Sequence, residues 1–162
     1  MKSSLGLLLS PSVDHVLFSV LGISVSLYAL YIEVKKSKDK NYKAACDLSE
    51  SMSCSRVLTS KYSKGFGMVE LLLGKEHFLN LPNCILGIVF YSLQLLLGLI
   101  HSSLAVNLLF FTSILSCLGS VYLAIVLFVI LKDVCLVCMA TYIINGILLF
   151  LNYQQYMYAT SS

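Results

Sequence analysis

Long apolar runs separated by short polar segments dominate the chain. Residues 13–34 form an apolar run of the length that a helix needs to cross a bilayer. Residues 77–131 contain no Asp, Glu, Lys or Arg, and a polar turn at residues 101–103 divides this stretch in two. A last apolar run follows the polar pair Lys132 and Asp133. The pattern therefore predicts four membrane-spanning helices, over residues 13–34, 82–100, 104–131 and 134–152.

The segment between the first two predicted helices, residues 35–81, is the only polar region of any length. It carries nine of the eleven Lys and Arg residues and two of the six cysteines. Within it, residues 66–79 mix apolar and polar side chains at helical spacing, which predicts a cap lying on the membrane surface. Because 162 residues are too few for two sizeable domains, we expect one all-α integral membrane domain over residues 1–162.

Composition supports a membrane protein. Hydrophobic residues make up 58% of the chain and charged residues 12%, whereas soluble domains carry roughly 25% charged residues. The mean hydropathy is +0.87. A cleaved signal peptide is an alternative for the first run, but the run is long for one and no small-residue cleavage site precedes the charges. The basic residues are not interleaved with aromatic ones, which gives no case for nucleic-acid binding.

A Cys-x-x-Cys pair, Cys135 and Cys138, stands at the start of the last apolar run. If the helix begins at Val134 with Asp133 as its N-cap, both sulfurs lie in the first turns and on one face. Free backbone N–H groups and the helix dipole there stabilise a thiolate. The pair is therefore a candidate redox centre at the edge of the membrane.

The even number of spans places the loop cysteines, Cys46 and Cys54, on the same side as Cys135 and Cys138. Two dithiols that face one space can pass electrons by thiol–disulfide exchange, through a mixed disulfide. The loop pair would collect electrons from a protein partner, and the membrane-edge pair would pass them to a small acceptor. We therefore predict an electron relay from Cys46 and Cys54 to Cys135 and Cys138, with Cys138 nearer the acceptor.

Polar and aromatic side chains with helical spacing surround this pair. Tyr142 and Asn145 follow Cys138 at i+4 and i+7. The second helix contributes an amide and two apolar groups from the same membrane edge, at Asn83, Leu86 and Phe90. A dithiol with an amide, a phenol and apolar walls suits a flat apolar ring with two oxygens, such as a quinone.

Simpler interpretations exist for each of these residues. The cysteines could bind zinc, but such sites use two close pairs and Cys46 and Cys54 stand eight apart, so we expect no metal. They could also form purely structural disulfides. Tyr142 alone suits an interfacial aromatic residue, and Asn83 alone suits a helix cap. Cys84 and Cys117 suit small buried apolar residues, and the three histidines show no pairing pattern.

Two rules predict opposite orientations of the chain in the membrane. The positive-inside rule places the Lys-rich loop in the cytoplasm. Paired cysteines operate most readily in an oxidising lumen, which places the same loop on the opposite side. We give precedence to the redox argument and expect the loop to be luminal.

Motifs along nearly the whole chain, from the first predicted helix to residue 153, resemble the vitamin K epoxide reductase family. Their order and spacing are highly specific. They include Cys46-Asp47-Leu48, Ser53-Cys54-Ser55-Arg56-Val57, Gly65-Phe66-Gly67, Leu79-Asn80 with Asn83 and Gly87, Phe90-Tyr91-Ser92-Leu93-Gln94, Gly119-Ser120-Val121-Tyr122 and Cys135-Leu136-Val137-Cys138.

The resemblance implies a four-transmembrane-helix bundle in the endoplasmic reticulum membrane, with a luminal loop, cap and active site and with cytosolic termini. It implies reduction of vitamin K 2,3-epoxide to the quinone, and of the quinone to the hydroquinone, in support of gamma-carboxylation of glutamate. Vitamin K is then a substrate, and no bound cofactor is expected. The implied partners are luminal thioredoxin-like oxidoreductases, membrane lipid and coumarin anticoagulants such as warfarin.

The resemblance also assigns roles to single residues. Cys135 and Cys138 are the implied catalytic pair, with Cys138 as the thiolate that attacks the substrate. Cys46 and Cys54 are the implied shuttle pair, with Cys54 attacking Cys135. The hydrogen-bonding residues for the substrate's oxygens and for warfarin-type inhibitors are Asn83 and Tyr142.

The chain departs from the family pattern at Cys84, where we expect Ser, at Tyr62, where the family usually has Trp, and in its uncharged C-terminal residues. Two other functions remain open at this point. One is the same fold with the electrons flowing in the opposite direction, in which a quinone oxidises partner thiols and so makes disulfides in luminal proteins. The other is a structural tetraspan protein without turnover, in which Cys46 and Cys54 stay paired under all conditions.

Overall fold

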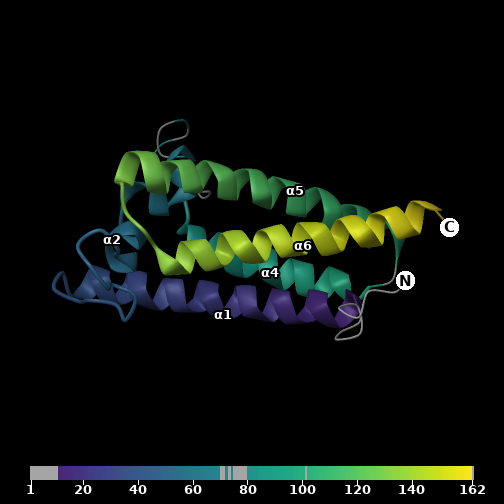
Figure 1. The fold of residues 1–162 in the computed structure, drawn as a ribbon, viewed down its shortest axis with the longest axis horizontal. Helices are drawn as coiled ribbons and strands as arrows, with labels where there is room; N and C mark the ends of the chain where they lie inside the picture. Colours follow the sequence, from purple (N-terminus) through teal and green to yellow (C-terminus); the bar gives the residue numbers. More distant parts are fainter. Residues whose placement is uncertain (1–10, 70–71, 73, 75–79, 101, 162) are drawn as a thin grey trace.

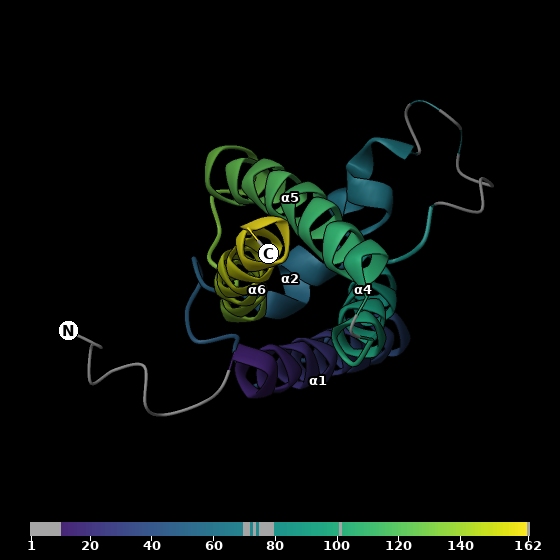
Figure 2. The ribbon, with the colours of Figure 1, turned by 90° about the vertical axis from the view of Figure 1, so that its right-hand side faces the viewer.

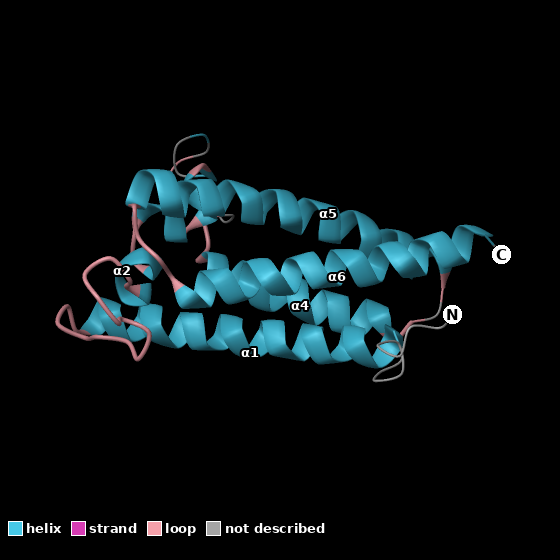
Figure 3. Ribbon diagram, viewed as in Figure 1, coloured by secondary structure: helices cyan, strands magenta, loops and turns pink. Residues whose placement is uncertain are grey.

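The computed structural model describes residues 11–69, 72, 74, 80–100 and 102–161. Four long helices lie side by side in this part of the chain (Figures 1 and 3). They are α1 (Pro11–Lys38), α4 (Asn83–Gly98), α5 (Ser103–Ile125) and α6 (Leu136–Ser161). Seen along the bundle in Figure 2, they follow one another around a ring, so that α1 packs against both α4 and α6.

Short elements occupy one end of the bundle. Between α1 and α4 the chain forms α2 (Cys54–Leu58) and two 3₁₀ turns, η2 (Lys61–Ser63) and η3 (Gly65–Gly67). A π-helical segment, η4 (Val126–Leu131), continues α5 at the same end. The described residues form isolated β-bridges but no named strand. The prediction of an all-α fold is confirmed for this part of the chain.

Among the described residues, three helices are long and apolar enough to cross a membrane: α1, α5 together with η4, and α6. The fourth, α4, is also apolar but has 16 residues, which is shorter than the span predicted over residues 82–100. Conversely, α6 continues well beyond residue 152, where the sequence pattern placed its end. The predicted cap, residues 66–79, lies largely outside the described residues.

The boundaries of α1 follow from local chemistry. Pro11 is its first described residue, and a proline is tolerated in the first turn of a helix because its missing N–H costs no hydrogen bond there. Asp14 lies in the first turn, and the last turn carries Lys35, Lys36 and Lys38. These charges oppose the helix dipole at both ends and so stabilise the helix.

Local chemistry also sets the start of α5 and the end of its continuation, η4. Ser102 caps α5 by accepting a hydrogen bond from the Ala105 N–H at 3.2 Å. At the other end, Lys132 adopts a left-handed conformation with φ of 51°, which stops the helix after η4. The chain then turns back towards α6 without a long connection.

Small residues bring α1 and α4 close together. A side chain at Gly22 would collide with the ring of Tyr91, and one at Gly87 would meet the hydroxyl of Ser26. Tyr91 is only 2% exposed and packs with Ile144 and Leu148 of α6. Large apolar residues on the outer face of α5 remain exposed, including Leu104, Phe111, Val121 and Ile125, as expected of a surface that meets lipid.

The two ends of the bundle differ in content. The start of α1 and the end of α6 lie together at one end, and α2 and the turn before α6 lie at the other (Figure 1). All four predicted redox cysteines are therefore gathered at the second end, within one buried cluster and its edge. The prediction that the loop and the Cys-x-x-Cys pair share one end of the molecule is confirmed.

Candidate functional site

Helix α6 begins two residues later than the sequence pattern predicted, and Asp133 is not its cap. The helix starts at Leu136, which leaves Cys135 in the capping position. Its sulfur accepts a hydrogen bond from the Cys138 N–H at 3.3 Å, and its carbonyl accepts one from the Met139 N–H at 2.9 Å. A cysteine thus takes the role that a serine or aspartate side chain usually has at a helix N-terminus.

The two sulfurs of the Cys-x-x-Cys pair lie together. The Cys138 thiol donates to the Cys135 sulfur over 2.7 Å. This hydrogen bond lowers the pKa of Cys135, assisted by the backbone N–H groups of Cys138 and Val137 and opposed by burial and by the charge of Asp133. Cys135 is therefore held as the better thiolate of the resting pair, with the proton of Cys138 directed at it.

A large cavity opens beside Cys138. Its volume is about 730 Å³, within the range of small-molecule sites, and its walls are mainly apolar. Cys138 lines the cavity, whereas Cys135 does not and is 0% exposed. The cavity is walled by all four long helices, and its lining includes the other residues predicted around the pair: Asn83, Leu86, Phe90, Tyr142 and Asn145.

Asn83 connects this cavity to the loop. Its amide N–H donates to the Tyr62 carbonyl at 2.7 Å, and its carbonyl accepts from the Phe66 N–H at 3.0 Å. Phe66 has a positive φ of 57°, which is unusual for a residue with a side chain. Asn83 therefore fixes the backbone of residues 62–66 and also lines the cavity.

Deeper in the cavity a second polar group is already satisfied. Asn145 accepts from the Tyr91 hydroxyl at 2.8 Å and donates to the Ser120 hydroxyl at 2.7 Å. Tyr142 lies one turn nearer the sulfurs and lines the same cavity. Within the described part of the protein, the Asn145 amide thus already has partners, whereas the Tyr142 hydroxyl is left to bind a ligand.

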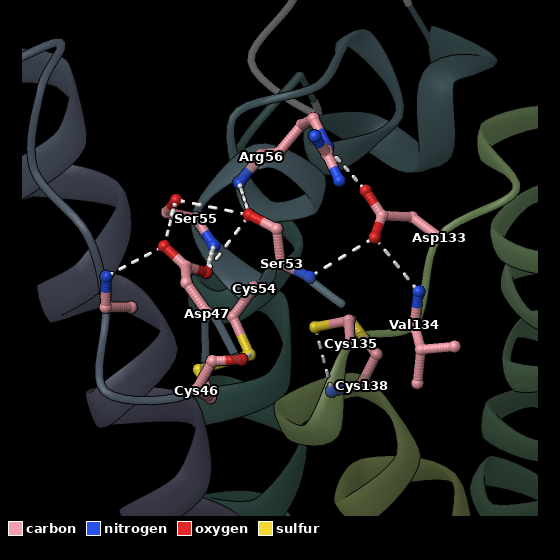
Figure 4. Close-up of a disulfide and its surroundings, with 11 residues drawn as sticks. Cys46, Asp47, Ser53, Cys54, Ser55, Arg56, Asp133, Val134, Cys135 and Cys138 are labelled. Carbon is pink, nitrogen blue, oxygen red and sulfur yellow. Dashed lines mark hydrogen bonds and ion pairs between the residues drawn. A yellow bond between two sulfur atoms is a disulfide. The ribbon is translucent and has the colours of Figure 1, made fainter. Parts of the chain in front are cut away.

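The loop cysteines are joined. Cys46 and Cys54 form a disulfide with Cα atoms 5.9 Å apart, and Cys54 is the first residue of α2 (Figure 4). Cys54 is 0% exposed and Cys46 8% exposed. Cys54 and Cys135 belong to the same buried cluster. The burial of the cysteines therefore follows an order, from Cys46 nearest the solvent through two fully buried sulfurs to Cys138 at the cavity.

Asp47 holds the loop disulfide in place. Its carboxylate accepts hydrogen bonds from the Ala44 N–H at 2.8 Å, the Ser53 hydroxyl at 3.0 Å, and both the N–H and the hydroxyl of Ser55 at 3.0 and 2.6 Å. Burial alone would raise the pKa of Asp47, but these four hydrogen bonds outweigh it and lower the pKa. The carboxylate is thus charged and organises both sides of the disulfide.

A second aspartate joins the loop to the turn before α6. Asp133 is 4% exposed and accepts from the Arg56 Nε at 2.6 Å, from the Ser53 N–H at 3.2 Å and from the Val134 N–H at 3.1 Å (Figure 4). The sequence pattern assigned it to the helix cap instead. No local signal could reveal this role, because Ser53 and Arg56 lie 80 and 77 positions away in the chain.

Sequence reasoning also missed a carboxyl group in the cavity wall. Glu33 of α1 lines the cavity and accepts a hydrogen bond from the Cys84 thiol at 3.2 Å. Cys84 is buried, as predicted, but it is also a hydrogen-bond donor at the cavity. The signal available in the sequence is a single acidic residue near the end of the first apolar run.

A buried polar layer lies in the other half of the bundle. We use this name for His15, Gln94, Ser113 and Asn152, which come from four different helices and are at most 1% exposed. His15 pairs with Gln94 at 3.2 Å, and Asn152 donates to Gln94 and to Ser113 at 2.9 and 2.6 Å. The sequence assigned no role to the histidines, and the structure gives His15 a partner in Gln94; His77 and His101 lie outside the described residues.

Comparison with known proteins identifies relatives along nearly the whole chain. The profile of the vitamin K epoxide reductase family matches residues 15–153. The chain is 44% identical over 146 residues to vitamin K epoxide reductase complex subunit 1 of Mus musculus, covering 90% of this chain and 91% of the relative. It is 42% identical, with the same coverage, to the protein of that name from Rattus norvegicus.

Proposed function

The chain belongs to the vitamin K epoxide reductase family, and from this premise we propose that it reduces vitamin K 2,3-epoxide to the quinone and the quinone to the hydroquinone. The observation that carries the proposal is the placement of Cys138 in the wall of an apolar cavity of about 730 Å³, with Cys135 buried directly behind it. A lipid-soluble ring fits such a cavity, and a dithiol supplies the two electrons.

The first half of the reaction opens the epoxide. As the Cys138 sulfur attacks a ring carbon, its proton passes to the Cys135 sulfur, towards which it already points. The carbon–oxygen bond breaks, and Tyr142 donates a hydrogen bond to the developing oxyanion. The product of this step is a thioether between Cys138 and a hydroxylated ring.

The second half releases the quinone. The Cys135 sulfur attacks the Cys138 sulfur, the new disulfide forms, and the carbon–sulfur bond breaks with its electrons returning to the ring. The hydroxyl then leaves as water. The epoxide oxygen leaves in that water, whose protons come from the Cys138 thiol, by way of Cys135, and from solvent, and the two electrons come from formation of the Cys135–Cys138 disulfide. Reduction of the quinone consumes a second dithiol and places both protons on the ring oxygens.

The disulfide is then reduced from the loop. Cys54 attacks Cys135, and Cys46 resolves the mixed disulfide, so that electrons enter at the more exposed cysteine and reach the buried pair. The donor is a luminal thioredoxin-like oxidoreductase. A disulfide between Cys46 and Cys54 is stable in an oxidising compartment, which supports a luminal loop in the endoplasmic reticulum and cytosolic termini.

We further propose that α4 completes a four-helix transmembrane bundle. Its apolar residues continue on both sides, at Leu81 and at Leu99 and Ile100, all of which are exposed. The same cavity would bind coumarin anticoagulants through Tyr142 and Asn83. Vitamin K is the substrate in this scheme, and the sulfurs replace a bound redox cofactor.

The test is epoxide reduction in membranes that contain the protein, with a small membrane-permeant dithiol as donor, with and without warfarin. The wild type is expected to form quinone and hydroquinone, and warfarin to inhibit both steps. Cys138→Ser is expected to lower turnover at least about 1,000-fold, since it removes the attacking sulfur. Cys117→Ser is the matched control, because its thiol bonds the Asn145 carbonyl and lies outside the cavity lining. Full activity of the Cys138→Ser variant would refute the assignment.

A further inference from the structure

We propose that Asp133 is a positioning residue: it docks the relay segment, residues 46–56, on the turn before α6 and so sets the rate of exchange between the two cysteine pairs. The inference deepens the proposed function and rests on it, because it concerns the internal step that recharges the catalytic dithiol. Figure 4 shows the carboxylate between the two segments.

The contacts of Asp133 fall next to the two sulfurs that exchange. Its Oδ1 accepts from the N–H of Ser53 and from the N–H of Val134. Ser53 immediately precedes Cys54, and Val134 immediately precedes Cys135. One oxygen atom therefore fixes, at the same point, the backbone from which each exchanging cysteine departs.

Two further links make the contact between the segments continuous. The other carboxylate oxygen accepts from the Arg56 Nε at 2.6 Å, on the far side of Cys54. Val134 also donates to the Ser51 carbonyl at 3.0 Å, and Met52 forms an isolated parallel bridge with Val134. The relay segment is thus attached to the turn both before and after Cys54.

Burial makes this attachment decisive for the exchange. Cys54 and Cys135 are both 0% exposed, and Asp133 is 4% exposed. Thiol–disulfide exchange requires the attacking sulfur to approach along the bond that breaks. Because neither sulfur is reached from water, their encounter is set by how the two segments are held rather than by diffusion, as in other reactions between prepositioned groups.

The negative charge of Asp133 does not itself favour the exchange, so an electrostatic role can be told apart from a positioning role. Its negative charge raises the pKa of Cys135, against the lowering effect of the Cys138 thiol. Loss of that charge would make Cys135 a better leaving group and would speed the resolution of a mixed disulfide. Loss of positioning would slow the exchange. The two roles predict opposite signs, so a rate measurement separates them.

The step itself balances. The Cys54 thiolate attacks the Cys135 sulfur of the Cys135–Cys138 disulfide; the Cys54–Cys135 bond forms, and Cys138 leaves as a thiolate that takes up a proton. The Cys46 thiolate then attacks the Cys54 sulfur, which forms the Cys46–Cys54 disulfide and releases Cys135 as a thiolate. Two electrons have passed from the loop pair to the catalytic pair.

The first experiment compares two electron donors in membranes containing the full chain. A thioredoxin-like protein dithiol must act through the loop pair, whereas a small membrane-permeant dithiol can reach Cys138 through the cavity. Asp133→Ala is expected to lower turnover with the protein donor about tenfold and to leave turnover with the small dithiol within about twofold. Asp39→Asn is the matched control, since this loop carboxylate bonds the Asn41 N–H within its own turn.

A graded pair of variants keeps the test valid if Asp133→Ala does not fold. Asp133→Asn retains a carbonyl oxygen for the Ser53 and Val134 N–H groups but loses the charge that binds Arg56. Its effect on the protein-donor rate is expected to lie between those of the wild type and Asp133→Ala. Arg56→Gln removes the same ion pair from the other side and is expected to match Asp133→Asn.

The second experiment needs no substrate. In a Cys46→Ser/Cys138→Ser background, diamide, a small membrane-permeant oxidant, takes two electrons and two protons from Cys54 and Cys135 and leaves them as a disulfide, which peptide mapping without reductant measures over time. Asp133→Ala is expected to slow this cross-link about tenfold, and Asp39→Asn to leave its rate unchanged.

The outcomes separate this inference from the proposed function. An unchanged or faster cross-link in Asp133→Ala would overturn the positioning role, as would an equal loss of turnover with both donors. If the wild type reduces no epoxide with the protein donor and none with the small dithiol, the proposed function is overturned. A slower cross-link would still support the role of Asp133 in that case.

Discussion

Two buried polar clusters lie at opposite ends of the same apolar bundle, and they are built from different groups. At the redox end, Asp47 and Asp133 bind backbone N–H groups, hydroxyls and one guanidinium, most of them in the loop. In the polar layer, neutral side chains of four helices bind one another. Both clusters pair polar groups that packing brings together, although Nδ1 of His15 and Oδ1 of Asn152 have no hydrogen-bond partner within the described residues.

The two clusters join different parts of the protein. The aspartates tie a segment with little regular structure to the helix ends, so their hydrogen bonds can break and re-form while the helices stay in place. The polar layer ties helix to helix at a depth where lipid offers no replacement partner. We therefore expect changes at the redox end to act on turnover and changes in the polar layer to act on stability.

The largest expected effect comes from removing the loop pair. The double substitution Cys46→Ser/Cys54→Ser is expected to lower turnover with a protein dithiol at least about 100-fold, because electrons then lack their path to Cys135. Turnover with a small dithiol is expected to stay within about threefold. The measurement is quinone formation from the epoxide with each donor.

Replacing both cysteines leaves no single loop thiol that attacks the catalytic pair. Cys117→Ser is the control and is expected to retain both activities. Equal losses with the two donors would show that the loop pair is structural, as in a tetraspan protein without a relay.

The next effect concerns the polar layer. Asn152→Leu removes donors to Gln94, Ser113 and the Leu109 carbonyl, and is expected to destabilise the protein by about 1–3 kcal/mol. Turnover per folded molecule should stay unchanged. Thermal denaturation in detergent measures the first quantity, and a donor assay on the same sample measures the second.

Asn107→Leu is the matched control, because Asn107 lies on the exposed face of α5. It is expected to change the free energy of unfolding by less than about 0.5 kcal/mol. A loss of turnover in Asn152→Leu at unchanged stability would break the proposed division between the two ends.

The smallest effect is a pH dependence at Asp47. Hydrogen bonds hold its pKa below the usual value, so the carboxylate contributes stability that is present above the unfolded pKa of about 3.9 and is lost as pH falls through the lower folded value. The melting temperature of the wild type is therefore expected to decrease as the pH is lowered below about 4. Asp47→Asn should have a lower melting temperature at neutral pH and a flatter profile in that acidic window, while Asp39→Asn keeps the wild-type profile.

Much of the candidate site was open to prediction from the sequence because its signals are local or periodic. Cys-x-x-Cys spacing, the apolar runs and the i, i+4, i+7 series from Cys138 each depend on a few neighbouring residues. Those signals placed Cys138, Tyr142, Asn83 and Asn145 around one space. The start of α6 was misplaced because a cysteine sulfur capped the helix, and capping preferences favour the aspartate two positions earlier.

The sequence alone determined that the chain forms apolar helices and that the loop cysteines and the Cys-x-x-Cys pair share one end, since hydrophobic periodicity and an even number of helices decide both. Only the tertiary structure decided which sulfurs are buried behind Cys138, and what Asp133, Glu33 and His15 contact. Those contacts join residues about fifty to eighty positions apart, and no local pattern encodes them because each depends on how whole helices pack against one another.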